Sequence, residues 1–105
     1  MKQLKFQPNL MSLVLSGEKT VTWRLFDEKN LSAGDKLEFI NSENKNKFAE
    51  AEIISVKEKP LVSLVDSDWA GHEKVTNPIE HYSNLYKTKV DEQTPVKIIR
   101  FKLIQ

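Results

Sequence analysis

Residues 17–24 read GEKTVTWR and bring a lysine, a threonine hydroxyl and an arginine within six residues, directly after an apolar run. A threonine hydroxyl is a weak nucleophile until a neighbouring base takes its proton, and a lysine can act as that base when its surroundings hold it neutral. An arginine keeps its charge throughout. Lys19, Thr22 and Arg24 therefore make this segment a candidate site for chemistry.

The residues before this segment predict a helix that ends where the segment begins. Apolar residues recur at helical spacing in residues 8–16, and Gly17 follows where a helix C-terminus favours a left-handed residue. In a regular strand, Lys19 and Thr22 would point to opposite faces. We therefore expect a positive φ at Gly17, with Lys19 still in the turn and the strand beginning near Thr20.

Strands account for most of the remaining pattern. Residues 36–40 and 48–56 alternate between apolar and polar side chains and flank the polar stretch 41–47, which predicts two antiparallel strands joined by a hairpin loop. The alternation slips at Ile53 and Ile54, and again at Ile98 and Ile99. Such slips indicate a bulge or burial on both faces of the strand, as barrel closure would give.

Two further helical segments are expected among the strands. Asn77 is a good N-cap, Pro78 suits the first helical position and Glu80 completes a capping box, so a helix should begin here and run to about residue 87. Residues 61–65 fit a single helical turn before a cluster of turn-forming residues at 66–68. The pattern as a whole predicts an α+β fold.

The chain resembles the ASCH domain family in four segments that occur in the family's order. They are the G-x-K-x-x-[E/T]-x-R signature at residues 17–24, with threonine at the variable position, and the segments LKF at 4–6, GDKL at 34–37 and VKIIRF at 96–101. The resemblance covers nearly the whole chain. It implies a PUA-like mixed β-barrel with two or three inserted helices, formed by residues 1–105 as a single domain.

The resemblance also implies catalytic roles, because threonine-type members include amidohydrolases. It implies Thr22 as the nucleophile, Lys19 as the group that takes its proton, and Glu73 as the residue that assists proton transfer to the leaving amine. The residues alone leave open that Glu73 is a solvated loop carboxylate. If Glu73 faces Lys19, its charge raises the lysine pKa, so burial and Arg24 would have to lower it.

Arg24 and Trp69 are the candidate substrate-binding residues. Arg24 fits a substrate carbonyl or phosphate, or a structural ion pair with Asp27 or Glu28 in the following loop. Trp69 lies near Gly71 and offers a large π-face on which a base can stack.

Other aromatic residues are expected in the core. Trp23 alternates with Thr22 along the predicted strand, which favours burial over ligand contact. Tyr82 and Tyr86 lie four residues apart and share one face of the predicted helix, as packed residues do.

Composition limits the partners. Sixteen basic and fifteen acidic residues leave a net charge of +1, which argues against a duplex DNA surface but suits a modified nucleoside or a short single-stranded RNA. The chain has no cysteine, and His72 and His81 lack supporting ligands, so we expect no metal and no cofactor. The apolar run at residues 10–15 is too short for a membrane span, and we expect a cytoplasmic protein without a membrane partner.

Two hypotheses for function follow. The first is an amidohydrolase that removes the acyl group from an N4-acylated cytidine or a related modified pyrimidine, through an acyl-threonine that water resolves. The second is a non-catalytic RNA-binding module that holds an exposed base. Both expect a cleft between the exit of the first helix, the strand that carries Thr22, and residues 69–73. A metal-dependent nuclease is disfavoured because no ligand cluster is present.

Overall fold

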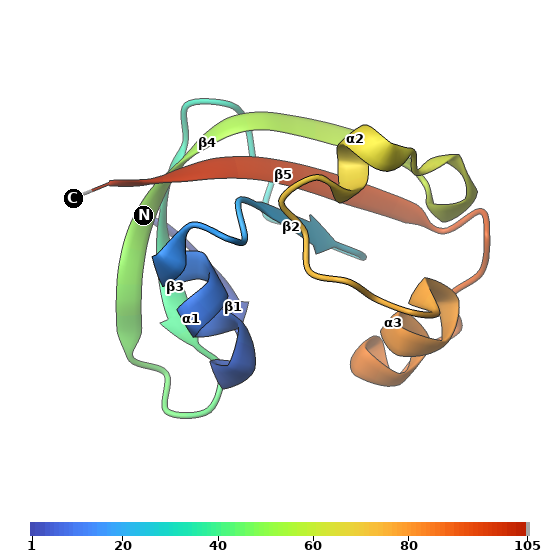
Figure 1. Cartoon of the computed structure of the whole chain (residues 1–105), viewed down its shortest axis with the longest axis horizontal. Coiled ribbons are helices and arrows are strands. Elements are labelled where there is room, and N and C mark those ends of the chain that lie inside the picture. Colours follow the sequence, from blue (N-terminus) through green and yellow to red (C-terminus); the bar gives the residue numbers. More distant parts are fainter. Residues whose placement is uncertain (105) are drawn as a thin grey trace.

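A computed structural model of the chain describes residues 1–104, which form one five-stranded mixed sheet with helices inserted between the strands (Figure 1). The expected α+β class is thereby confirmed. In chain order the elements are β1 (Lys2–Phe6), α1 (Pro8–Ser16), β2 (Val21–Arg24), β3 (Lys36–Asn41), β4 (Lys47–Pro60), the 3-10 helix η1 (Leu61–Ser63), α2 (Asp66–Trp69), α3 (Pro78–Tyr86) and β5 (Pro95–Ile104).

The sheet curls into a half-barrel in the strand order β1-β3-β4-β5-β2. β1 and β3 are parallel, and every other neighbouring pair is antiparallel. The long strand β4 bends so that its first half pairs with β3 and most of its length pairs with β5 (Figure 1). The predicted hairpin is confirmed, since β3 and β4 are antiparallel on either side of residues 42–46. The strand order places β1 and β2 at the two edges of the sheet, and residues of both strands line the site described below.

Both slips in the strand alternation have a structural cause. The pairing of β4 with β5 shifts between Ile53 and Ser55, so Ile54 is a bulge residue and its side chain is 51% exposed. Ile98 and Ile99 are both buried, but they belong to different core clusters. The first slip is therefore a bulge and the second is burial on both faces of β5.

Two apolar clusters make up the core. The first packs α1 against the sheet and is built largely from β1, β3, β4 and β5, with Phe6, Phe39 and Phe101 as its largest members. The second packs β2 against α3 and contains Trp23 and Tyr82. The expected burial of Trp23 and Tyr82 is confirmed, with exposed fractions of 3% and 4%.

The helix boundaries agree with the signals in the sequence. α1 ends at Ser16 and is capped by Gly17, which has the predicted positive φ, at +85°, and donates its N–H to the Val14 carbonyl at 3.2 Å. α3 begins at Pro78, and the Asn77 side chain accepts a hydrogen bond from the Glu80 N–H at 3.2 Å. The short helix α2 was not predicted beyond a tendency to turn. No helix in residues 1–104 is long and apolar enough to cross a membrane.

Candidate active site

The segment that joins α1 to β2 places Lys19 outside the strand. The Lys19 N–H donates to the Leu13 carbonyl at 2.9 Å, and β2 begins only at Val21. Lys19 therefore still belongs to the turn after α1, as predicted, and the alternation of side chains along a strand does not direct it away from Thr22. Its side chain is free to fold back under the strand that carries Thr22.

A loop far away in sequence is fastened to the start of β2. The N–H groups of Thr20 and Val21 both donate to the Gly71 carbonyl, at 2.8 and 3.2 Å. Gly71 has φ +82°, and a Cβ atom at this position would lie 2.1 Å from the Thr20 hydroxyl oxygen. A glycine is therefore required for this close approach. The approach brings His72 and Glu73 next to the segment 17–24.

Lys19 is a buried cation with two partners. Its side chain is 2% exposed, and its ammonium donates to the Val21 carbonyl at 2.8 Å and to the carboxylate of Glu73. The Val21 carbonyl belongs to the peptide bond that precedes Thr22, so the ammonium lies beside the Thr22 backbone. Burial lowers the pKa of Lys19, contact with Glu73 opposes this, and Arg24 adds to the lowering.

Glu73 links the buried lysine to the surface. Burial acts to raise the pKa of Glu73, but the charge and hydrogen bond of Lys19 outweigh it and the pKa is lowered. The side chain of Glu73 is 21% exposed and lines a cleft, whereas Lys19 lies behind it. The resting pair is therefore an ammonium and a carboxylate.

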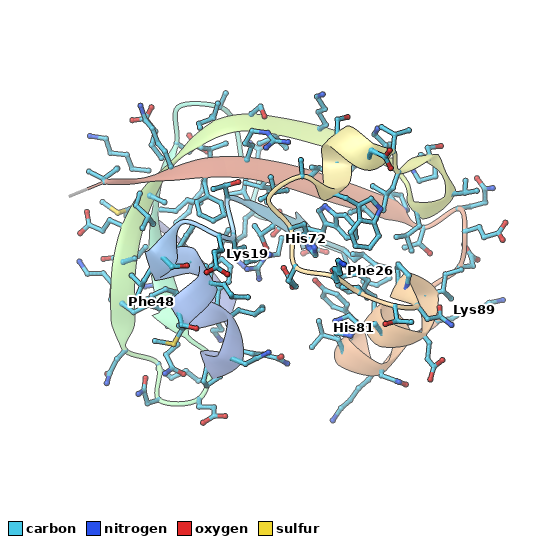
Figure 2. The ribbon with its side chains drawn as sticks, viewed as in Figure 1. Lys19, Phe26, Phe48, His72, His81 and Lys89 are labelled. Carbon is cyan, nitrogen blue, oxygen red and sulfur yellow. The ribbon has the colours of Figure 1, made fainter. Side chains whose placement is uncertain are left out.

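The cleft has a volume of about 830 Å³, within the usual range of small-molecule sites. Thr22, Arg24 and Glu73 line it together with other residues of the segment 72–77 and most of α3. The expectation that the exit of α1 borders the cleft is wrong, because the start of α1, at residues 7–10, lies there instead. Figure 2 shows the labelled Lys19 and His72 side chains between α1 and α3.

Arg24 is held in the cleft wall without an ionic partner. Its guanidinium carbon lies 4.7 Å from the centre of the Phe6 ring, and its Nε is buried without a hydrogen-bond partner. No carboxylate of residues 1–104 lies within ion-pair distance of Arg24. The pairing with Asp27 considered from the sequence is not formed, because Asp27 binds Lys97 at 3.2 Å. The guanidinium is therefore available to an oxygen-rich ligand.

Trp23 is buried as expected, but Trp69, contrary to expectation, does not line the cleft. Trp23 lines the cleft as well as the core, and its ring stacks on His72 at 3.9 Å between centroids. Trp69 packs edge-on behind Trp23 at 4.5 Å and is not among the residues that line the cleft. The helix α2 causes this arrangement, since the Asp68 carbonyl at its end accepts the Trp23 indole N–H at 3.3 Å.

His72 is a site residue whose role the sequence did not reveal. Its side chain is 1% exposed, and its Nδ1–H donates to the Glu73 carbonyl at 2.7 Å. Burial and the charge of Lys19 lower the pKa of His72 to about 4, so the ring is neutral near pH 7. No group of three or more histidines or acidic residues within the described part of the chain is arranged to hold a metal ion.

Comparison with known proteins supports the fold. No protein-family model matches the sequence, and no curated protein matches it. A crystal structure of a protein from Enterococcus faecalis superposes with a TM-score of 0.72 at 17% identity, over 91% of this chain and 70% of that one.

Two similar structures carry the ASCH name. An ASCH domain from Lactobacillus crispatus has a TM-score of 0.68 at 19% identity, over 90% of this chain and 70% of that one. An ASCH protein from Zymomonas mobilis has a TM-score of 0.68 at 12% identity, over 95% of this chain and 65% of that one. The chain therefore has the fold of the ASCH domain proteins, a curled mixed sheet with inserted helices.

Proposed function

We propose that this chain is an amidohydrolase that removes the acyl group from an N4-acylated cytidine or a related modified pyrimidine. The observation that carries the proposal is the position of Thr22, which lines the cleft directly after the carbonyl bound by the Lys19 ammonium. The Thr22 side chain and the Glu73 carboxylate thus line the same cleft, and the buried Lys19 amine is hydrogen-bonded to that carboxylate behind it, which supplies the types of group that nucleophilic catalysis on an amide uses.

The Lys19–Glu73 pair can supply both proton transfers. Moving one proton from Lys19 to Glu73 gives a neutral amine and a neutral carboxyl, and a bound substrate favours this form because it excludes water. The amine accepts the Thr22 proton as Oγ attacks the acyl carbonyl carbon, and Glu73 protonates the departing N4 nitrogen. The amide C–N bond breaks, and both side chains return to their starting charges.

The product of this step is an ester between the acyl group and Thr22, which water then hydrolyses to release a carboxylic acid.

The cleft also supports recognition of the pyrimidine. The half-buried Tyr86 side chain lines the cleft and offers aromatic surface, and Arg24 offers an unpaired cation for a carbonyl or phosphate oxygen.

The proposal is tested by hydrolysis of N4-acetylcytidine, followed by chromatography of the released cytidine. Thr22→Ala should abolish hydrolysis while the fold and the affinity for cytidine persist, and Thr22→Ser should retain part of the rate. Lys19→Ala should be comparably inactive. Glu73→Gln should lose less, because removal of the carboxylate lowers the pKa of Lys19 further and preserves the neutral base, so that only the proton donor to the leaving group is lost. Full activity of Thr22→Ala would refute the acyl-threonine route.

The competing function is a non-catalytic module that binds single-stranded RNA. It would be supported by wild-type protein that binds a short RNA tightly yet hydrolyses no acylated cytidine.

A further inference from the structure

A second cavity adjoins the cleft across Arg24. It has a volume of about 420 Å³ and is lined by Leu4, Tyr86 and residues 24–29. Arg24 and Tyr86 line both cavities, so the unpaired guanidinium stands where the two meet. Each cavity is large enough for a small ligand group.

The wall of this second cavity carries an exposed aromatic ring in a strained position. Phe26 is 54% exposed, and its backbone has φ +57°, a left-handed conformation that is an outlier for a bulky residue. The ring meets Tyr86 edge-on at 5.6 Å, which fixes its orientation. The fold therefore holds the large apolar ring of Phe26 at the surface of the cavity, although the left-handed backbone conformation of this residue is unfavourable.

We infer that the site takes its cytidine as part of a nucleic acid strand, with the neighbouring base stacked on Phe26 in the second cavity and the phosphate between the two nucleosides bound by Arg24. The inference rests on the proposed function in one respect, namely that the larger cleft holds the cytidine. It specifies the substrate class as at least a dinucleotide.

The charges of the region agree with a single bridging phosphate. Asp27, the acidic residue nearest the guanidinium along the chain, is neutralised by Lys97. Glu28 and Lys29, of opposite charge, complete the lining of the second cavity. A planar guanidinium donates two parallel hydrogen bonds to a phosphate, and one such contact needs no broad basic surface. The net charge of +1 is therefore no obstacle.

The Arg24 environment also explains why a phosphate is favoured over a neutral carbonyl. The buried Nε has no hydrogen-bond partner, and the groups near the guanidinium are the Phe6 ring face, the side chains of Tyr82 and Tyr86, and the more distant carboxylates of Asp27 and Glu73. A cation that is partly desolvated and forms no ion pair gains more from an anion in direct contact than from a neutral acceptor.

Binding of unacylated ligands tests the inference independently of hydrolysis. Titration calorimetry would compare cytidine, cytidine monophosphate and the two dinucleotides of cytidine and uridine, which place cytidine first or second. We expect at least one dinucleotide to bind more tightly than the monophosphate. Phe26→Ala should weaken that dinucleotide about 5-fold to 30-fold, the lower part of the range for one stacked base, and Phe26→Tyr should preserve most of the affinity.

Removal of the cation should act on every phosphate-bearing ligand. Arg24→Gln should weaken the dinucleotide about 10-fold or more, and Arg24→Lys should recover only part of the loss because it lacks the planar fork. Val62→Ala and Lys102→Gln are matched controls, since they remove an apolar group that is 58% exposed and an exposed charge, respectively, away from both cavities. Both should bind as the wild type does.

The outcomes separate this inference from the proposed function. Dinucleotides that bind no more tightly than the monophosphate, or a Phe26→Ala variant with unchanged dinucleotide affinity, would overturn the inference even if N4-acetylcytidine is hydrolysed. Dinucleotide binding that depends on Phe26 and Arg24, without any hydrolysis, would uphold the inference and contradict the amidohydrolase. Failure of every ligand to bind would overturn the inference, and hydrolysis of N4-acetylcytidine alone would then decide the amidohydrolase proposal.

Discussion

Gly71→Ala should be the most damaging substitution of a glycine in this chain. Gly71 has φ +82°, and an added Cβ would lie 2.1 Å from the Thr20 hydroxyl oxygen and 3.4 Å from its Cβ. The Gly71 carbonyl accepts the two hydrogen bonds that fasten the loop to the start of β2. The substitution therefore introduces a steric clash at the same contact that positions His72 and Glu73.

The expected loss has two parts. An alanine in a left-handed conformation costs about 1 kcal/mol, and relieving an overpacked contact costs about 1–3 kcal/mol. The free energy of unfolding should thus fall by about 2–4 kcal/mol, a large share of the roughly 5–15 kcal/mol typical of a domain.

Gly17 provides a matched control for the backbone part. Gly17 has φ +85°, but an added Cβ would meet nothing within 4 Å. Gly17→Ala should therefore cost only about 1 kcal/mol. Urea unfolding of both variants measures the difference.

A double-mutant cycle isolates the clash itself. Thr20→Ala removes the hydroxyl that an added Cβ would meet, so Gly71→Ala in that background should cost little more than Gly17→Ala. Equal losses for Gly71→Ala with and without the Thr20 hydroxyl would refute the reasoning. An unaltered rate of hydrolysis in Gly71→Ala would refute the claim that this contact positions the site.

Two further predictions concern the buried charges. Glu73→Gln should lower the free energy of unfolding by about 3 kcal/mol, because it leaves the Lys19 ammonium, which is 2% exposed, without its counter-charge and out of reach of water. Lys19→Met should cost less, because the Glu73 carboxylate that it leaves unpaired reaches the cleft. Urea unfolding that gives the opposite order would contradict this prediction. His72 has a pKa of about 4 in the folded chain against an ordinary value of 6.5, so the unfolded chain binds more protons between these values. His72 should accordingly lower the free energy of unfolding by about 3 kcal/mol as the pH drops from 6.5 to 4. Unfolding curves measured across this pH range should show a decrease that is smaller by this amount for His72→Gln than for the wild type.

Local signals in the sequence were sufficient for most of the fold. Gly17 and Asn77 mark helix ends through their own backbone and side-chain preferences, so they could be read without knowledge of the tertiary structure. The slip at Ile53 and Ile54 was visible because a bulge breaks a period of two. Whether a slip means a bulge or burial on both faces, however, depends on what packs against the strand.

The details of the site depended on contacts between distant segments. The loop at residues 70–73 meets β2 through Gly71, and no local pattern specifies that approach. For the same reason, the sequence favoured Trp69 over Trp23 as the residue facing the cleft and assigned no role to His72. The only available sign was a glycine next to a histidine and a glutamate, which is too common to interpret alone.

The most direct test of the central claim is mass spectrometry of the protein quenched during turnover of N4-acetylcytidine. The account predicts a fraction of the wild-type chains heavier by one acetyl group, with the added mass on the peptide that contains Thr22, together with release of cytidine. Thr22→Ala should show neither the added mass nor the product. Cytidine released by wild-type protein and Thr22→Ala at equal rates, or an acetyl group found on another residue, would contradict the account.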